Sequence, residues 1–211
     1  MAKLVLYLPK LGLCFTLLGL YMDGIAESTV SSNPSGIDFI RASCRATLYP
    51  ALCVQCLSSY ANTIQQSQRQ LAQAALSVSL ARAQSTSAFV SRIAKTTGLN
   101  PRVYQAVQDC IDNMAYSVDQ LNQSVQELGY MGRGNGQDFM WHASNVQTWV
   151  SAALTDENTC VNGFADNAMD GNVKAAIKSR VISVAQVTSN ALALVNRFAT
   201  RHRAGAAHNI P

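Results

Sequence analysis

Cysteines are the residues of this sequence whose spacing points most directly to chemistry. Cys44 and Cys53 flank a Tyr-Pro pair in the stretch CRATLYPALC, and Cys56 follows Cys53 in a CxxC arrangement. A Cys44–Cys53 bridge would close a short turn, whereas a Cys53–Cys56 pair is typical of thiol redox sites. Because no βαβ pattern surrounds the CxxC, we predict the structural Cys44–Cys53 bridge.

The remaining cysteines fit a second structural bridge. The chain contains six cysteines, and Cys14 lies in an N-terminal segment that we expect to be removed. In an oxidising compartment an odd number of cysteines leaves one thiol unpaired. We predict a Cys110–Cys160 disulfide and a free thiol at Cys56.

Catalytic patterns are weak. Cys56 and His142 would form a nucleophile pair only if the fold brought them together, and an unpaired cysteine in a helical protein is more often a buried thiol. Asp156 and Glu157 are adjacent on a predicted helix, so their side chains diverge. The sequence has no HExxH, no metal-spaced Cys/His set and no Gly-x-Ser-x-Gly. We therefore expect a protein that is not an enzyme and needs neither metal nor cofactor.

Two loop-like stretches resemble ligand-binding motifs only superficially. MGRGNG (131–136) is rich in glycine, but no strand precedes it as in a phosphate-binding loop. DNAMDGN (166–172) has Ala168 where a calcium loop needs an oxygen ligand, and Ile177 where it needs the closing Glu. Both are predicted to be connections between helices.

Helical periodicity explains most of the chain. Apolar residues step by three or four along one face after Asn100, which can cap a helix that begins at Pro101. The members of this stripe are Val103, Val107, Cys110, Met114, Val118, Leu121, Val125 and Leu128. A second stripe contains Val173, Ile177, Val181, Val184, Val187, Ala191, Leu194 and Phe198. Further helices are expected over about 68–96 and 138–166, with Trp149 in the core.

These elements predict an all-α fold. We expect an antiparallel four-helix bundle over about 68–200, preceded by a disulfide-bridged helical hairpin over about 37–64. The two parts form one domain, 27–200, and residues 201–211 are expected to form a polar tail. The Cys110–Cys160 bridge would join the second and third long helices.

The N-terminus and the charge indicate secretion. Residues 1–26 combine lysines, an apolar run from Leu11 to Met22 and small residues before a cut after Ala26, which is typical of a signal peptide. The run is too short for the roughly 20 residues of a membrane span. A formal net charge of +4 is too small and diffuse to indicate a nucleic-acid partner.

Four stretches together resemble the plant invertase and pectin methylesterase inhibitor family. They are FIRASCRATLYPALC (39–53), DCIDNMAYSVDQL (109–121), SNVQTWVSAALTDENTC (144–160) and VAQVTSNALALVN (184–196). The resemblance implies the two disulfides predicted above, a helical hairpin before a four-helix bundle, and a location in the plant cell wall space. Invertase inhibitors of this family use a Pro-Lys-Phe motif, which this sequence lacks. The segment TWVSAALTDENTC (148–160) resembles instead the pectin methylesterase inhibitor branch, which is therefore favoured.

The resemblance also implies a mechanism and a partner. Such inhibitors form a non-covalent one-to-one complex with plant pectin methylesterase and cover its pectin-binding cleft. The residues of this chain that we expect at the interface are Thr155, Asp156, Glu157, Asn158 and Thr159. Carboxylates there would make binding depend on pH. The alternative is that these residues only solvate or cap a helix.

Other expectations concern modification and alternative functions. Asn122-Gln-Ser124 is an N-glycosylation sequon, whereas the one at Asn33 is blocked by Pro34.

The alternatives to the favoured branch are an invertase inhibitor and a non-inhibitory structural or signalling bundle, since a fold does not establish function.

Overall fold

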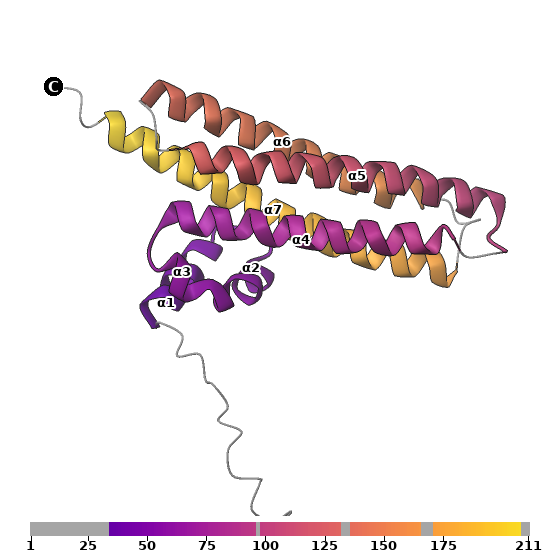
Figure 1. The fold of residues 1–211 in the computed structure, drawn as a ribbon. Coiled ribbons are helices and arrows are strands. Elements are labelled where there is room, and N and C mark those ends of the chain that lie inside the picture. The colour runs from indigo at the N-terminus through magenta and orange to yellow at the C-terminus, as the bar shows by residue number, and fades with distance from the viewer. Residues whose placement is uncertain (1–33, 96–97, 132–135, 166–170, 208–211) are drawn as a thin grey trace, which may run out of the picture. The chain divides into compact units, whose positions relative to one another are not determined.

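The structure, a computed structural model, describes residues 34–95, 98–131, 136–165 and 171–207, and every regular element among them is a helix (Figure 1). All belong to one compact unit. The elements are α1 (Pro34–Cys44), α2 (Pro50–Leu57), the short 3-10 helix η1 (Ser58–Tyr60), α3 (Ala61–Ile64), α4 (Gln68–Ile93), α5 (Pro101–Tyr130), α6 (Gly136–Gly163) and α7 (Asn172–Ala207). This confirms the all-α prediction. None of the helices described has the length and apolar character of a membrane span.

Local signals fix where α4 and α5 begin. The Asn100 side chain accepts a hydrogen bond from the Arg102 amide at 2.9 Å, and Pro101 occupies the first turn, where it leaves no amide unsatisfied. Ser67 caps α4 in the same way, because its hydroxyl accepts from the Gln70 amide at 3.2 Å. The predicted Asn100 cap is therefore confirmed.

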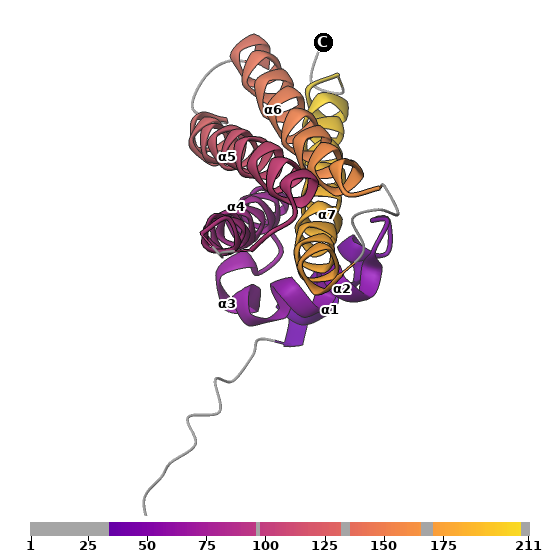
Figure 2. The same cartoon turned by 90° about the vertical axis from the view of Figure 1, so that its right-hand side faces the viewer.

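The core lies between the four long helices. Figure 2 shows α4 to α7 side by side, with α1, α2 and α3 against α4 and α7. The predicted stripes face inward: among others, Val107, Met114, Leu121 and Leu128 of α5 are fully buried. Burial of such aliphatic side chains contributes roughly 25 cal/mol per Å² of apolar surface removed from water. Trp149 is an exception to the prediction, since it is half-buried and lies outside the core.

Two disulfides join neighbouring helices. Cys44 at the end of α1 is bonded to Cys53 of α2, and Cys110 of α5 is bonded to Cys160 of α6. They are the pairs expected from the sequence. All four half-cystines are buried.

A close backbone approach holds α1 against α3. A Cβ atom added at Gly36 would lie 2.6 Å from the Ala61 carbonyl oxygen. Only glycine allows this contact without a shift of one helix.

The end of α7 differs from the predicted tail. The backbone stays helical from Arg201 to Ala207, although the side chains of 201–205 are exposed. The reason is packing against the start of α6. The Phe139 ring lies edge-on to the Phe198 ring, with 5.5 Å between the ring centroids, and stacks on the His202 ring, with 3.5 Å between the centroids. The predicted signal peptide and most of the connections at 131–136 and 166–172 lie outside the described residues.

Candidate functional site

The segment 155–159 of α6 does not present its five side chains to one surface. Thr155, Asn158 and Thr159 are exposed, Asp156 is half-buried, and Glu157 is completely buried. The cause is helical periodicity: position 157 continues the inward stripe of Val150 and Ala153 at steps of three and four. The expectation that Glu157 contacts a partner is therefore wrong.

Glu157 instead links three helices inside the bundle. Its Oε1 atom accepts hydrogen bonds from the Ser117 hydroxyl of α5 at 2.8 Å and the Thr188 hydroxyl of α7 at 2.9 Å. Its Oε2 atom is buried and has no hydrogen-bond partner among the described residues. Burial is the main cause that raises the pKa of Glu157 to about 7; the hydroxyl hydrogen bonds oppose the shift, and the Asp156 charge adds to it.

Asp156 occupies the boundary between the interior and the surface. Its Oδ2 atom accepts a hydrogen bond from Gln120 Nε2 of α5 at 3.1 Å. Burial raises the pKa of Asp156 above its ordinary value. This carboxyl group is accessible to a partner, but it is already oriented by α5.

The exposed members of the segment form a rigid polar row. The Thr155 hydroxyl donates to the Ser151 carbonyl at 3.0 Å, and the Thr159 hydroxyl donates to the Thr155 carbonyl at 2.8 Å. Asn158 Nδ2 donates to the Leu154 carbonyl at 2.8 Å. Each side chain is thereby held against its own helix, which continues unbroken to Gly163. The Asn158 Oδ1 atom, which does not donate, is left to accept hydrogen bonds from a partner.

A groove beside this row was not foreseen from the sequence. It has a volume of about 190 Å³ and lies between the loop after α1, α6 and α7. Its lining consists of Leu48, Tyr49, Leu154, Asn158, Ile182, Ala185, Gln186 and Ser189. Leu48 is 70% exposed and Ile182 is 39% exposed, so the rim is apolar and open.

The loop that carries Leu48 is fixed at several points. The Tyr49 amide donates to Asn190 Oδ1 at 3.0 Å, and Asn190 Nδ2 donates back to the Tyr49 carbonyl at 3.0 Å. The Cys44–Cys53 disulfide closes the same loop. A signal for this contact exists in the sequence, because Asn190 lies on the inward side of α7 between Val187 and Leu194 and a buried amide needs partners.

Comparison with known proteins shows to which family the chain is similar. The model of the plant invertase/pectin methylesterase inhibitor family matches residues 38–194. The chain belongs to this family. Pectinesterase inhibitor 11 of Arabidopsis thaliana is 45% identical over 203 residues, which cover 96% of this chain and 100% of that protein. Pectinesterase inhibitor 9 of the same plant is 51% identical over 191 residues, 89% of this chain and 94% of that protein.

A solved structure agrees with the fold of this family member. A mutant form of a pectin methylesterase inhibitor from Arabidopsis superposes with a TM-score of 0.61 at 21% identity, covering 77% of this chain and 96% of the other. At this identity the likeness concerns the fold alone.

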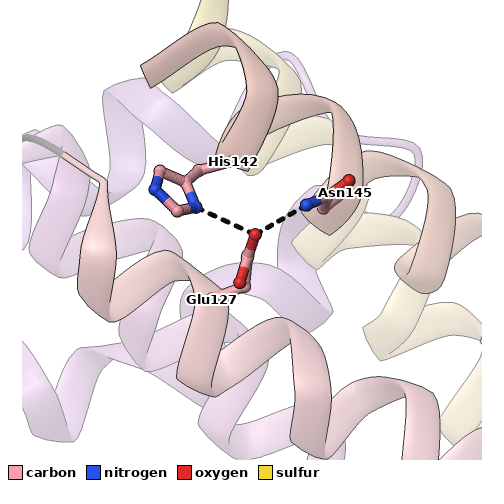
Figure 3. A network of polar contacts seen from close by, with 3 residues as sticks. All are labelled: Glu127, His142 and Asn145. Atoms are coloured by element: carbon pink, nitrogen blue, oxygen red, sulfur yellow. Dashed lines mark hydrogen bonds and ion pairs between the residues drawn. The ribbon is translucent and has the colours of Figure 1, made fainter. Parts of the chain in front are cut away.

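Cys56 and His142, which were considered as a catalytic pair, each interact with another side chain in this inhibitor-family protein. His142 Nδ1 lies 2.9 Å from Glu127 Oε1, and Asn145 Nδ2 donates to the same oxygen at 2.7 Å (Figure 3). Cys56 is a free thiol whose sulfur accepts a hydrogen bond from Arg82 Nη2 at 3.2 Å. In the part of the chain that the structure describes, no His, Cys, Asp and Glu cluster could hold a metal ion.

Asn122 is exposed on α5 of this family member. Attachment of a glycan needs such a position, whereas Ser124 of the same sequon is buried and bonds to the Gln120 carbonyl. Glycosylation of Asn122 stays a prediction.

Proposed function

We propose that this protein is a secreted inhibitor of plant pectin methylesterase that acts in the cell wall space and controls the methylesterification of pectin. It would bind the enzyme non-covalently and one-to-one, covering the cleft that receives pectin, and would not itself catalyse a reaction. Membership in the inhibitor family and the names of the similar Arabidopsis proteins support the target. The signal-peptide pattern of residues 1–26 supports secretion.

The polar row of α6 lies beside the apolar rim of the groove, and this observation assigns the proposed contact to particular residues. Thr155, Asn158 and Thr159 offer oriented polar groups on a rigid helix, and the adjacent groove exposes Leu48 and Ile182. A surface of this kind loses little conformational entropy on binding, because its side chains and its loop are already held in place. We assign this surface, with the accessible edge of Asp156, as the esterase contact.

Leu48 is expected to contribute most. An exposed leucine on a loop fixed by a disulfide and by Asn190 can enter a pocket of the partner and lose its water there. The polar row would surround this anchor, which is the usual arrangement of an interface with an apolar centre and a polar rim.

A paired titration tests the function. Purified oxidised protein is added to a plant pectin methylesterase and, separately, to a plant acid invertase at mildly acidic pH. We expect ester hydrolysis to fall to a floor near one equivalent while invertase keeps its activity. Inhibition of the invertase alone would establish the alternative branch, and inactivity on several isoforms of both enzymes would favour a non-inhibitory bundle.

Matched variants test the surface. Leu48→Ala is expected to weaken inhibition by about tenfold or more, as for a central interface anchor. Tyr104→Ala removes another exposed apolar side chain, 46% exposed at the start of α5, and serves as the control. Equal inhibition constants for the two variants would remove the groove from the mechanism.

A further inference from the structure

Charged side chains are divided between two halves of the bundle. Among the described residues, every acidic side chain except Asp38 lies on α5 or α6. Every basic side chain except Arg102 lies outside these two helices, on α1, α4, α7 or the loops after α1 and α4. α5 packs beside α6, while α4 packs against α7 and both contact the hairpin helices (Figure 2). The whole sequence has a formal net charge of only +4, yet its described part combines an acidic half with a strongly cationic one.

Exposed cations gather where α4 ends and α7 begins. The Arg180 guanidinium carbon lies 4.1 Å from the centroid of the Phe89 ring, so the first turns of α7 face the last turns of α4. Arg92 is one helical turn beyond Phe89 and leaves the same side of α4. Lys95 follows just after the helix, and all three cations are exposed. We call Arg92, Lys95 and Arg180 the α4–α7 basic cluster.

The cluster is partly preorganised for anions. The Phe89 ring holds the Arg180 guanidinium by a cation–π contact, and this contact does not use the N–H donors of the guanidinium. Arg82 also ties the two helices together, because its Nη1 atom donates to the Ser183 hydroxyl at 2.8 Å. The relative position of Arg92 and Arg180 is therefore set by the packing of α4 against α7.

We propose that the α4–α7 basic cluster binds a polyuronate, an acidic polysaccharide with a carboxylate on each sugar. Guanidinium groups match carboxylates in shape and charge, and a repeating polymer can engage several cations at once. The choice of polyuronate over other polyanions rests on the proposed function, because hydrolysis of pectin methyl esters leaves such carboxylates. The inhibitor would then be retained where the product of its target enzyme accumulates.

This surface is separate from the proposed esterase contact. Ile182 of the groove lies two residues from Arg180, and side chains two apart on a helix point to nearly opposite sides. The acidic α5–α6 half would be repelled by the polymer, which favours binding through α4 and α7. Esterase and polysaccharide can therefore be bound together.

Binding to polygalacturonate and to highly methylesterified pectin, in calcium-free buffer without esterase, tests the proposal. We expect polygalacturonate to bind, NaCl to weaken binding, and the esterified polymer to bind far less. The triple variant Arg92→Gln, Lys95→Gln, Arg180→Gln is expected to lose about tenfold in affinity. The charge-matched control Arg41→Gln, Arg201→Gln, Arg203→Gln should stay within about twofold of the parent.

Several results would overturn the inference. Equal losses in both triple variants would mean that only net charge matters, and equal binding of esterified pectin would exclude carboxylate recognition. Stronger binding to a DNA duplex or to anionic lipid vesicles would assign another partner class. The single variant Lys95→Gln, outside any helix, keeps the test valid if the triple variant misfolds, and it should bind more weakly than the parent. Esterase inhibition measured separately distinguishes failure of this proposal from failure of the proposed function.

Discussion

Ser117 and Glu157, on α5 and α6, are joined in the interior by a hydrogen bond of 2.8 Å from the serine hydroxyl to the carboxyl oxygen. Thr188 of α7 donates to the same oxygen at 2.9 Å. One carboxyl group therefore connects three of the four long helices at a point where water is excluded. A buried charge of this kind is costly unless it is neutralised by a proton.

Stability is predicted to fall as the pH rises through the range in which Glu157 ionises. The folded protein holds the proton up to about pH 7, whereas the unfolded chain releases it near 4.5. The free energy of unfolding should therefore decrease by about 3 kcal/mol between pH 4.5 and about pH 7, and it should level off at higher pH. Denaturant unfolding at pH 5 and pH 8 measures this. Glu157→Gln should remove most of the slope, and Asp112→Asn, at an exposed carboxyl, should not.

The long-range disulfide is predicted to stabilise more than the short one. The Cys110–Cys160 bridge spans 50 residues and the Cys44–Cys53 bridge spans 9. Loop entropy gives about 4 and about 3 kcal/mol for them. Unfolding curves of the double serine variant of each pair would show the difference. A smaller loss for Cys110→Ser, Cys160→Ser than for the short pair would contradict this order. Cys56→Ser is the control.

The Asn190 contact is predicted to link loop geometry to inhibition. Asn190→Ala leaves the Tyr49 amide and carbonyl without their partner, which should cost about 1–3 kcal/mol of stability and release the loop that carries Leu48. Inhibition of the esterase should weaken at a temperature at which the variant is still fully folded. Asn196→Ala, at an exposed position of α7 outside the groove, is the control. Unchanged inhibition with lowered stability would separate the loop from the function.

Gly36 is predicted to tolerate no side chain. In Gly36→Ala the new methyl group would meet the Ala61 carbonyl oxygen at 2.6 Å, so α1 must move away from α3, at roughly 1–3 kcal/mol. Gly129→Ala is the matched control, because a Cβ there meets no atom within 4 Å. Thermal unfolding of the two variants compares them directly, and equal midpoints would show that α1 shifts without cost.

The start of α5 and the short Cys44–Cys53 loop could be predicted because their causes are local. The Asn100–Pro101 start of α5 follows from cap chemistry in two adjacent residues. The continuation of α7 through Arg201 to Ala207 could not be predicted, since it depends on Phe139, which lies about sixty residues earlier in the chain, at the start of α6.

The segment 155–159 also combines features that the sequence predicts with features that only packing decides. Its exposed hydroxyl and amide groups follow from composition, and the inward position of Glu157 follows from the spacing of Val150, Ala153 and Cys160. The pattern was present in the sequence, but the charge of the glutamate argued for the surface. Only the packed structure supplies the buried hydroxyls that make an interior carboxyl tolerable.

The sequence by itself thus determined the helices, the Asn100 cap and the Cys44–Cys53 loop, because each depends on neighbouring residues or on a fixed period. It also indicated the family, through four separate stretches, and the Cys110–Cys160 pair, through the number of cysteines. Tertiary structure alone decided that Asn190 holds the Tyr49 backbone, that Glu157 meets Ser117 and Thr188, and that Arg180 lies over Phe89. The physical reason is that these contacts depend on the rotation and register of separate helices. Packing of the whole core sets both quantities, and no single stretch of sequence specifies them.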